Sequence, residues 1–151
     1  MSTRPHCQGT VTAKTFAQLQ TKTWAAIQKW TALSITGSWL TTTGSLLYHR
    51  EHKETWFCAA QSCRAENSEA FAGQHAVTST SFYLFDEASA IPDKIFEVAE
   101  GGLTDGEPII FAFGNPTRST GKFYRITFGS ERERWIHRSI DSRNCALPNK
   151  R

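Results

Sequence analysis

Two wholly apolar runs constrain the fold of this 151-residue sequence more than any other feature. They are Ser-Phe-Tyr-Leu-Phe at residues 81–85 and Pro-Ile-Ile-Phe-Ala-Phe at residues 108–113. Neither run alternates polar with apolar residues, which is typical of strands buried on both faces of a parallel sheet. Between them, residues 92–100 begin with Pro92, carry apolar residues on one side and end at two glycines, which predicts a helix. The order strand, helix, strand predicts a right-handed βαβ unit.

Further strands and one long helix are predicted around this unit. Residues 17–33 predict an amphipathic helix, because apolar and Thr side chains recur at three- and four-residue spacings: Phe16, Leu19, Thr23, Ile27 and Trp30. Strands are expected over residues 9–13, 38–48 (kinked at Gly44), 55–61 and 134–140, and a loop with one helical turn over 61–80. We therefore expect an α/β fold with a mostly parallel sheet flanked by helices.

Length and composition favour one globular unit and exclude some classes of protein. A chain of 151 residues can bury a core, and a charged fraction of 21% with a net charge of +3 argues against disorder. No run approaches 18 apolar residues, so no membrane-spanning helix is expected. The first ten residues lack the apolar segment of a signal peptide, so we expect a soluble, intracellular protein.

Charge and cysteine are unevenly distributed. Residues 118–151 carry nine Lys/Arg against three Asp/Glu, whereas residues 1–117 carry eight against eleven. The basic stretch is read either as a solvated face or as a surface that binds nucleic acid. The four cysteines, at positions 7, 58, 63 and 145, lack the spacing of a zinc site, so we expect reduced thiols.

Polar residues follow both apolar strands, where function gathers in parallel sheets. Asp86-Glu87 after the first strand is the Walker B pattern, in which one carboxylate holds Mg²⁺ and the next polarises an attacking water. The alternative is that the pair caps a helix and suits its dipole. Residues 114–117, Gly-Asn-Pro-Thr, follow the second strand and offer an amide and a hydroxyl that can sense phosphate; the alternative is a plain Asn-Pro turn.

The 151 residues contain no Walker A sequence, whose glycines and Lys cradle phosphates. Gly114 with Thr120-Gly121-Lys122-Phe123 comes nearest, but the spacing differs and Phe123 stands where a hydroxyl is needed. Arg118 and Lys122 are therefore read as surface cations near the crevice.

Several of these segments resemble one family. Residues 84–105 resemble the Walker B region of phage terminase large subunits, and residues 111–123 resemble the coupling motif that follows it. Residues 18–24 and 69–73 match earlier segments of that family in the same order. The chain thus resembles the middle and later part of a P-loop NTPase core, over residues 1–151, without its Walker A segment or the nuclease domain.

The resemblance implies a motor that uses Mg²⁺ and ATP to package double-stranded DNA into a capsid in the bacterial cytoplasm. It implies a terminase small subunit, a capsid portal and a ring of self-associated subunits as partners, and no membrane. Asp86 would be the metal carboxylate and Glu87 the catalytic residue. The coupling or phosphate-sensing residues would be Gly114, Asn115, Pro116 and Thr117, and contacts to DNA or phosphate would come from Arg118, Lys122 and Arg125.

Three hypotheses follow from these differences between the chain and the family it resembles. Without a Walker A loop, the chain alone is expected to be inactive as an ATPase. A second hypothesis is a non-catalytic DNA-binding or assembly module that uses residues 118–151. A third is an inactive prophage remnant, whose sheet lacks a strand and exposes an unpaired edge.

Overall fold

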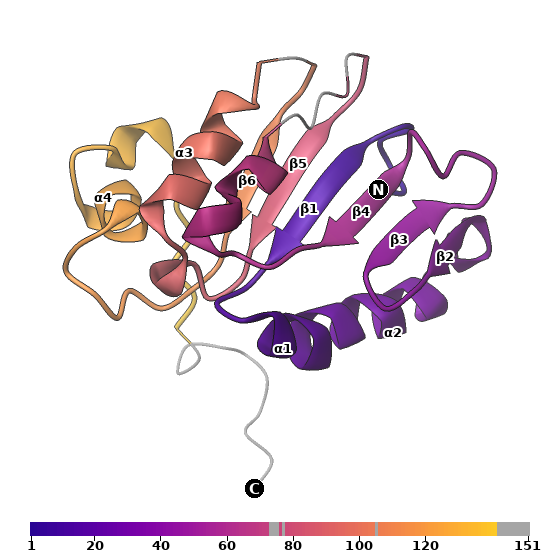
Figure 1. The fold of residues 1–151 in the computed structure, drawn as a ribbon, viewed down its shortest axis with the longest axis horizontal. Helices are drawn as coiled ribbons and strands as arrows, with labels where there is room; N and C mark the ends of the chain where they lie inside the picture. Colours follow the sequence, from indigo (N-terminus) through magenta and orange to yellow (C-terminus); the bar gives the residue numbers. More distant parts are fainter. Residues whose placement is uncertain (73–75, 77, 105, 142–151) are drawn as a thin grey trace, which may run out of the picture.

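A mostly parallel sheet forms the centre of the molecule (Figure 1). The computed structural model describes residues 1–72, 76, 78–104 and 106–141. Within these residues the sheet has six strands in the order β2-β3-β4-β1-β5-β6. Their bounds are β1 (Gln8–Thr12), β2 (Leu40–Thr42), β3 (Leu46–His49), β4 (Phe57–Ala60), β5 (Ser81–Phe85) and β6 (Ile109–Ala112). Strands β4, β1, β5 and β6 run parallel, and β2 and β3 add an antiparallel edge.

Helices flank the sheet, and the pair α1 and α2 lies in a different part of the molecule from the pair α3 and α4 (Figure 1). The long helical segment consists of α1 (Phe16–Gln18), the π-helical turn η1 (Leu19–Trp24) and α2 (Ala25–Leu33). The other α-helices are α3 (Asp93–Gly101) and α4 (Lys122–Phe128). Short 3₁₀ turns complete the fold: η2 (Gly37–Trp39), η3 (Ala65–Phe71), η4 (Ala88–Ala90) and η5 (Arg132–Arg134).

Two apolar clusters hold these layers together. One joins β5, α3 and α4 through fully buried side chains such as Tyr83, Phe85 and Phe96. The other packs Leu19 and Trp24 against β1, β3 and β4. Alternate residues of β5 face different clusters, because Phe82 and Leu84 pack against the second one. The predicted α/β fold and its βαβ unit, β5-α3-β6, are confirmed.

Strands β5 and β6 are less buried on both faces than their apolar sequences predicted. Phe82 and Leu84 are only half-buried, and Phe111 of β6 is 46% exposed. The reason is that the second cluster is centred on β1, β3 and β4 rather than on the outer strand β6. Within the described residues, no helix is both long and apolar enough to cross a membrane.

The predicted long helix is confirmed, but its buried side differs from the prediction. Trp30 is 65% exposed and Phe16 is 43% exposed, whereas Leu19 and Trp24, five residues apart, are almost fully buried. The π-helical turn accounts for the difference, because it closes hydrogen bonds between residues five apart and so shifts the face that meets the core.

Two predicted strands were wrong. Residues 38–48 do not form one kinked strand, because β2 and β3 pair as a hairpin with Gly44 in the turn. The hydroxyl of Thr43 accepts a 3.0 Å hydrogen bond from the backbone N–H of Leu46 and stabilises this turn. Residues 134–140 form no strand: after η5 the chain is irregular, and Ile136 is 96% exposed. Helix α4 was not predicted.

The contact between β1 and β5 predicts a strong effect of a single methyl group. A Cβ added to Gly9 would lie 2.0 Å from the ring of Phe82. Gly9→Ala should therefore lower the free energy of unfolding by about 1–3 kcal/mol through overpacking, as measured by urea denaturation. Gly44→Ala is the control, because nothing lies within 4 Å of a Cβ added there. Equal stability of the two variants would contradict the packing described.

Candidate active site

The carboxyl ends of β5 and β6 lie side by side, as the βαβ unit requires. The two strands pair in parallel, with Phe85 opposite Ala112. The pairing continues past the strands, since Phe113 N–H donates to the carbonyl of Phe85 at 2.8 Å. Ala88 N–H donates in turn to the carbonyl of Phe113 at 2.8 Å. The structure therefore brings the Asp86-Glu87 pair and the segment 114–117 to one edge of the sheet.

Asp86 is held at the end of β5 by three hydrogen bonds. Its backbone N–H donates to the carbonyl of Thr12 on β1 at 2.9 Å, which extends the sheet by one residue. Its side-chain Oδ1 accepts the backbone N–H of Glu87 at 2.9 Å, and Oδ2 accepts the hydroxyl of Thr23. Each carboxylate oxygen can accept more than one hydrogen bond, so the half-buried group keeps capacity for a ligand.

Glu87 adopts a left-handed backbone conformation, with φ of 52° and ψ of 43°. This conformation costs a residue with a Cβ about 1–2 kcal/mol. The neighbouring hydrogen bonds hold it there, since the Glu87 carbonyl accepts the N–H of Ala90 at 2.9 Å. No described residue donates a hydrogen bond to the half-buried carboxylate of Glu87. The sharp turn thus presents an uncommitted carboxylate at the edge where the two strands end.

The segment 114–117 is joined to this turn by a close approach and one hydrogen bond. A Cβ added to Gly114 would lie 3.0 Å from the backbone nitrogen of Ala88, so glycine allows the two backbones to approach. The hydroxyls of Ser89 and Thr117 are 3.1 Å apart and share a hydrogen bond. Asn115 and Pro116 are exposed. The hydroxyl of Thr117 therefore lies beside the carboxylate turn.

The donor set suits a magnesium ion that also binds phosphate. Mg²⁺ in nucleotide sites uses one or two carboxylates together with phosphate oxygens and water. Asp86 supplies such a hard oxygen ligand in a fixed orientation. In the described part of the chain, no group of three or more His, Cys, Asp or Glu side chains could hold a metal ion by itself. The carboxylate of Asp86 is thus of a type that fits a magnesium ion.

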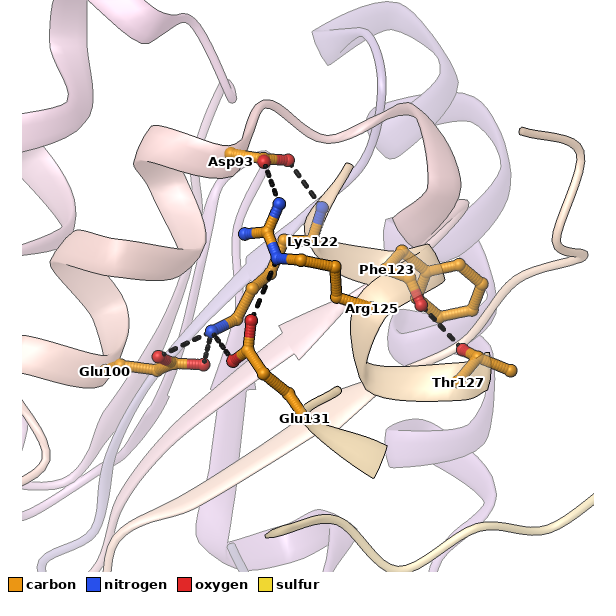
Figure 2. Close-up of polar contacts among 7 residues, drawn as sticks. All are labelled: Asp93, Glu100, Lys122, Phe123, Arg125, Thr127 and Glu131. Carbon is orange, nitrogen blue, oxygen red and sulfur yellow. Dashed lines mark hydrogen bonds and ion pairs between the residues drawn. The ribbon is translucent and has the colours of Figure 1, made fainter. Parts of the chain in front are cut away.

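A network of ion pairs fastens α4 to α3 (Figure 2). The ammonium of Lys122 lies 2.9 Å from Glu100 and also contacts Glu131, and its side chain is only 6% exposed. Arg125 contacts Asp93 at 3.0 Å and Glu131 at 2.9 Å. The backbone N–H of Lys122 donates to Asp93 at 2.7 Å. The network anchors the far end of the segment that begins at Gly114.

The network shifts the acidity of its members. Burial alone would lower the pKa of Lys122, but hydrogen bonds to Glu131 and Glu100 outweigh it and raise that pKa. Hydrogen bonds from Lys122 and Arg125 lower the pKa of Glu131. Both groups are thereby held in their charged forms.

Comparison with known proteins bears on the family of this chain. No family model matches it. Over 72 residues it is 43% identical to "Probable terminase, large subunit" of Enterobacteria phage P7, and the match covers 48% of this chain and 14% of that protein. The chain is similar to a phage terminase large subunit. It spans only a small part of the length of this relative.

The Thermus phage P74-26 large terminase ATPase domain aligns over 75% of this chain and 50% of that one, with 19% identity and a TM-score of 0.47.

Two of the segments singled out in the sequence contain the strand ends just described. Residues 84–104 run from the end of β5 past α3, and residues 111–123 run from β6 to the first turn of α4. Of the three cations singled out in the sequence, Arg118 is exposed, whereas Lys122 and Arg125 pair with carboxylates. The interpretation of Lys122 as a surface cation is wrong, because α3 and Glu131 enclose it. The contact of Arg118, Lys122 and Arg125 with DNA or phosphate stays a prediction.

Sequence reasoning missed four side chains that position the site: Thr23, Asp93, Glu100 and Glu131. Thr23 gave no signal, because it was assigned to the core-facing side of a regular helix. The carboxylates gave only a weak one, since Asp93 and Glu100 stand in an acidic stretch that also reads as helix surface. Cys7, Cys58 and Cys63 are buried free thiols, as expected, whereas Cys145 lies outside the described residues. Burial raises the pKa of Cys58 to about 12.

Removal of the buried cation should destabilise the fold. Lys122→Met leaves Glu100 and Glu131 without their shared partner, which costs about 3 kcal/mol of unfolding free energy, the low end for a buried pair. The low end applies because the side chains of Glu100 and Glu131 are 28% and 20% exposed and because Glu131 keeps its ion pair with Arg125. Lys94→Ala is the control, since Lys94 forms an exposed pair with Glu97 and should change stability by less than about 0.5 kcal/mol. Similar losses in urea denaturation would refute the buried network.

The lowered pKa of Glu131 predicts a specific dependence of stability on pH. A carboxyl group whose pKa is lower in the folded state stabilises the protein at pH values above its ordinary pKa of 4.5. This contribution is lost as the pH falls below that value. The free energy of unfolding should therefore fall more steeply on acidification in the wild type than in Glu131→Gln. Unfolding curves at several acidic pH values measure both slopes. Parallel slopes would mean that Glu131 is not held by Lys122 and Arg125.

Proposed function

We propose that this chain forms part of the ATPase of a phage terminase large subunit, within a P-loop NTPase core. The observation that carries the proposal is the pairing of the β5 and β6 ends, which sets Asp86 and Glu87 beside residues 114–117. The 43% identity over 72 residues to the phage P7 protein supports it. The substrate would be ATP, and the work would be the packaging of double-stranded DNA.

Each carboxylate has a separate role in this proposal. Asp86 would hold Mg²⁺, which when bound neutralises charge on the phosphates. Its two hydrogen bonds, from Thr23 and from the Glu87 backbone, keep its oxygens in one orientation. Glu87 would orient the attacking water and accept its proton, since its carboxylate has no hydrogen-bond donor among the described residues.

Residues 114–117 would couple this chemistry to DNA. Gly114 contacts the Glu87–Ala88 backbone, and Thr117 shares a hydrogen bond with Ser89. Movement of the Glu87 turn would therefore shift the segment that leads to α4. The exposed Arg118 lies directly after Thr117 and would contact phosphate or DNA. The small subunit, the portal and a ring of subunits are the partners that this role requires.

The phosphate cradle would come from outside these 151 residues, which contain no Walker A sequence. Strand β6 is an edge of the sheet within the described residues, and its four residues carry no charge. An uncharged edge can pair with a further strand. We therefore propose that the purified chain hydrolyses ATP negligibly by itself.

The role of Glu87 can be tested in a complete terminase. In a complete terminase large subunit that hydrolyses ATP and carries residues 81–121 of this chain in place of its own Walker B and coupling motifs, Glu87→Gln should reduce turnover by about 100-fold or more. Glu97→Gln is the matched control, because Glu97 lies on α3 and forms only an exposed pair with Lys94. Equal turnover by the two variants would contradict the catalytic assignment.

A further inference from the structure

A hydroxyl from a distant segment holds the proposed metal carboxylate. Thr23 lies 63 residues before Asp86 in the sequence and donates from Oγ1 to Asp86 Oδ2. It comes from the π-helical turn η1, whereas Asp86 follows strand β5. Both side chains are half-buried, so the contact is shielded from water without being closed to it. A charge-assisted bond of this kind is about twice as strong as a neutral one.

The unusual helix geometry explains why Thr23 reaches Asp86. Leu19 is fully buried and Trp24 is 1% exposed, although they lie five residues apart. In a regular α-helix, side chains five apart point about 140° away from each other, so both could not enter one cluster. The π-helical turn allows both to pack against β1, β3 and β4. Thr23 immediately precedes the anchored Trp24, so its position is set by the core.

A second hydrogen bond fixes Trp24 and thereby Thr23. The indole Nε1 of Trp24 donates to the carbonyl of Thr43 in the hairpin turn at 2.9 Å. The indole ring is therefore held at its polar end as well as by its apolar contacts. Thr23 is thus placed by a rigid neighbour, which is what an oriented hydroxyl requires.

The two carboxylate oxygens of Asp86 accept hydrogen bonds from two different parts of the chain. Thr23 holds Oδ2 from the helix, and the backbone N–H of Glu87 holds Oδ1 at 2.9 Å. Glu87 itself has a left-handed backbone conformation directly after this contact. A carboxylate fixed at both oxygens loses little rotamer freedom when it binds an ion, which favours binding.

We propose that Thr23 is the positioning residue of the metal carboxylate, orienting Asp86 for Mg²⁺. This inference rests on the proposed function, which assigns the metal to Asp86. Thr23 acts through Asp86 and does not itself contact the ion. Residues that orient metal ligands typically contribute about 10- to 100-fold to metal affinity. The wide turn of η1 is therefore part of the site, although it lies on a different element from the strand ends.

The same helix supplies a matched control. Thr21 is also in η1, but its hydroxyl donates to the carbonyl of Ala17 in its own helical segment at 2.7 Å. Thr21 is exposed and Thr23 is half-buried. A change at Thr21 therefore removes a hydroxyl from the same turn without touching Asp86.

The experiment measures Mn²⁺ affinity of the full chain by water-proton relaxation, with Mn²⁺ as the probe for Mg²⁺. Thr23→Val, which keeps the shape and removes the hydroxyl, should weaken Mn²⁺ binding by about 10-fold. Thr23→Ser should remain within about twofold of the wild type, because the hydroxyl is restored. Thr21→Val should not change the affinity. Urea denaturation of each variant establishes that it is folded, and Thr23→Ala replaces Thr23→Val if the latter is not.

Asp86→Asn separates the two levels of the argument. If it binds Mn²⁺ as tightly as the wild type, the metal assignment in the proposed function is wrong. If it loses Mn²⁺ while Thr23→Val binds normally, the role of Thr23 is overturned and the metal assignment stands. A Thr23→Ser variant as weak as Thr23→Val would also overturn the role, because a restored hydroxyl should restore the affinity.

Discussion

The parallel pairing of β5 with β6 is the constraint on which the site depends. It continues beyond the strands through the hydrogen bonds from Phe113 to Phe85 and from Ala88 to Phe113. These bonds force the turn after β5 and the segment after β6 to share one edge. The left-handed backbone of Glu87 follows from this, because the turn must bring Ala88 back to Phe113 directly after Asp86. The cost of that conformation is offset by the hydrogen bonds around it.

The two ends of the segment after β6 are held by different forces. At Gly114 the contact is a close backbone approach to Ala88, which depends on the missing Cβ. At Lys122 it is a set of shielded ion pairs to Glu100 and Glu131. The residues between them are largely exposed, while the two ends of the segment are held against the Glu87 turn and against α3. Binding and catalytic residues are often carried by loops that a rigid scaffold positions in this way.

The sequence predicted the parts of the fold that depend on local pattern. The apolar runs at β5 and β6, and Pro92 before α3, predicted the βαβ unit and the shared edge. Long-range contacts escaped prediction. The π-helical turn follows from the burial of Leu19 and Trp24, a spacing that helical periodicity does not include. The pairing of Lys122 with Glu100 depends on how α4 packs on α3. The β-branched residues at 134–140 do not pair with a strand in the described part of the chain.

The central proposal is that Asp86 binds a metal ion beside residues 114–117, and Mn²⁺-induced broadening of backbone amide signals tests it most directly. Bound at Asp86, Mn²⁺ should broaden the amide signals of residues 86–88. It should also broaden those of residues 114, 115 and 117 at the end of the neighbouring strand. Asp86→Asn should abolish both effects together. Broadening confined to other parts of the chain, or broadening at 86–88 that never reaches Gly114, would contradict the account.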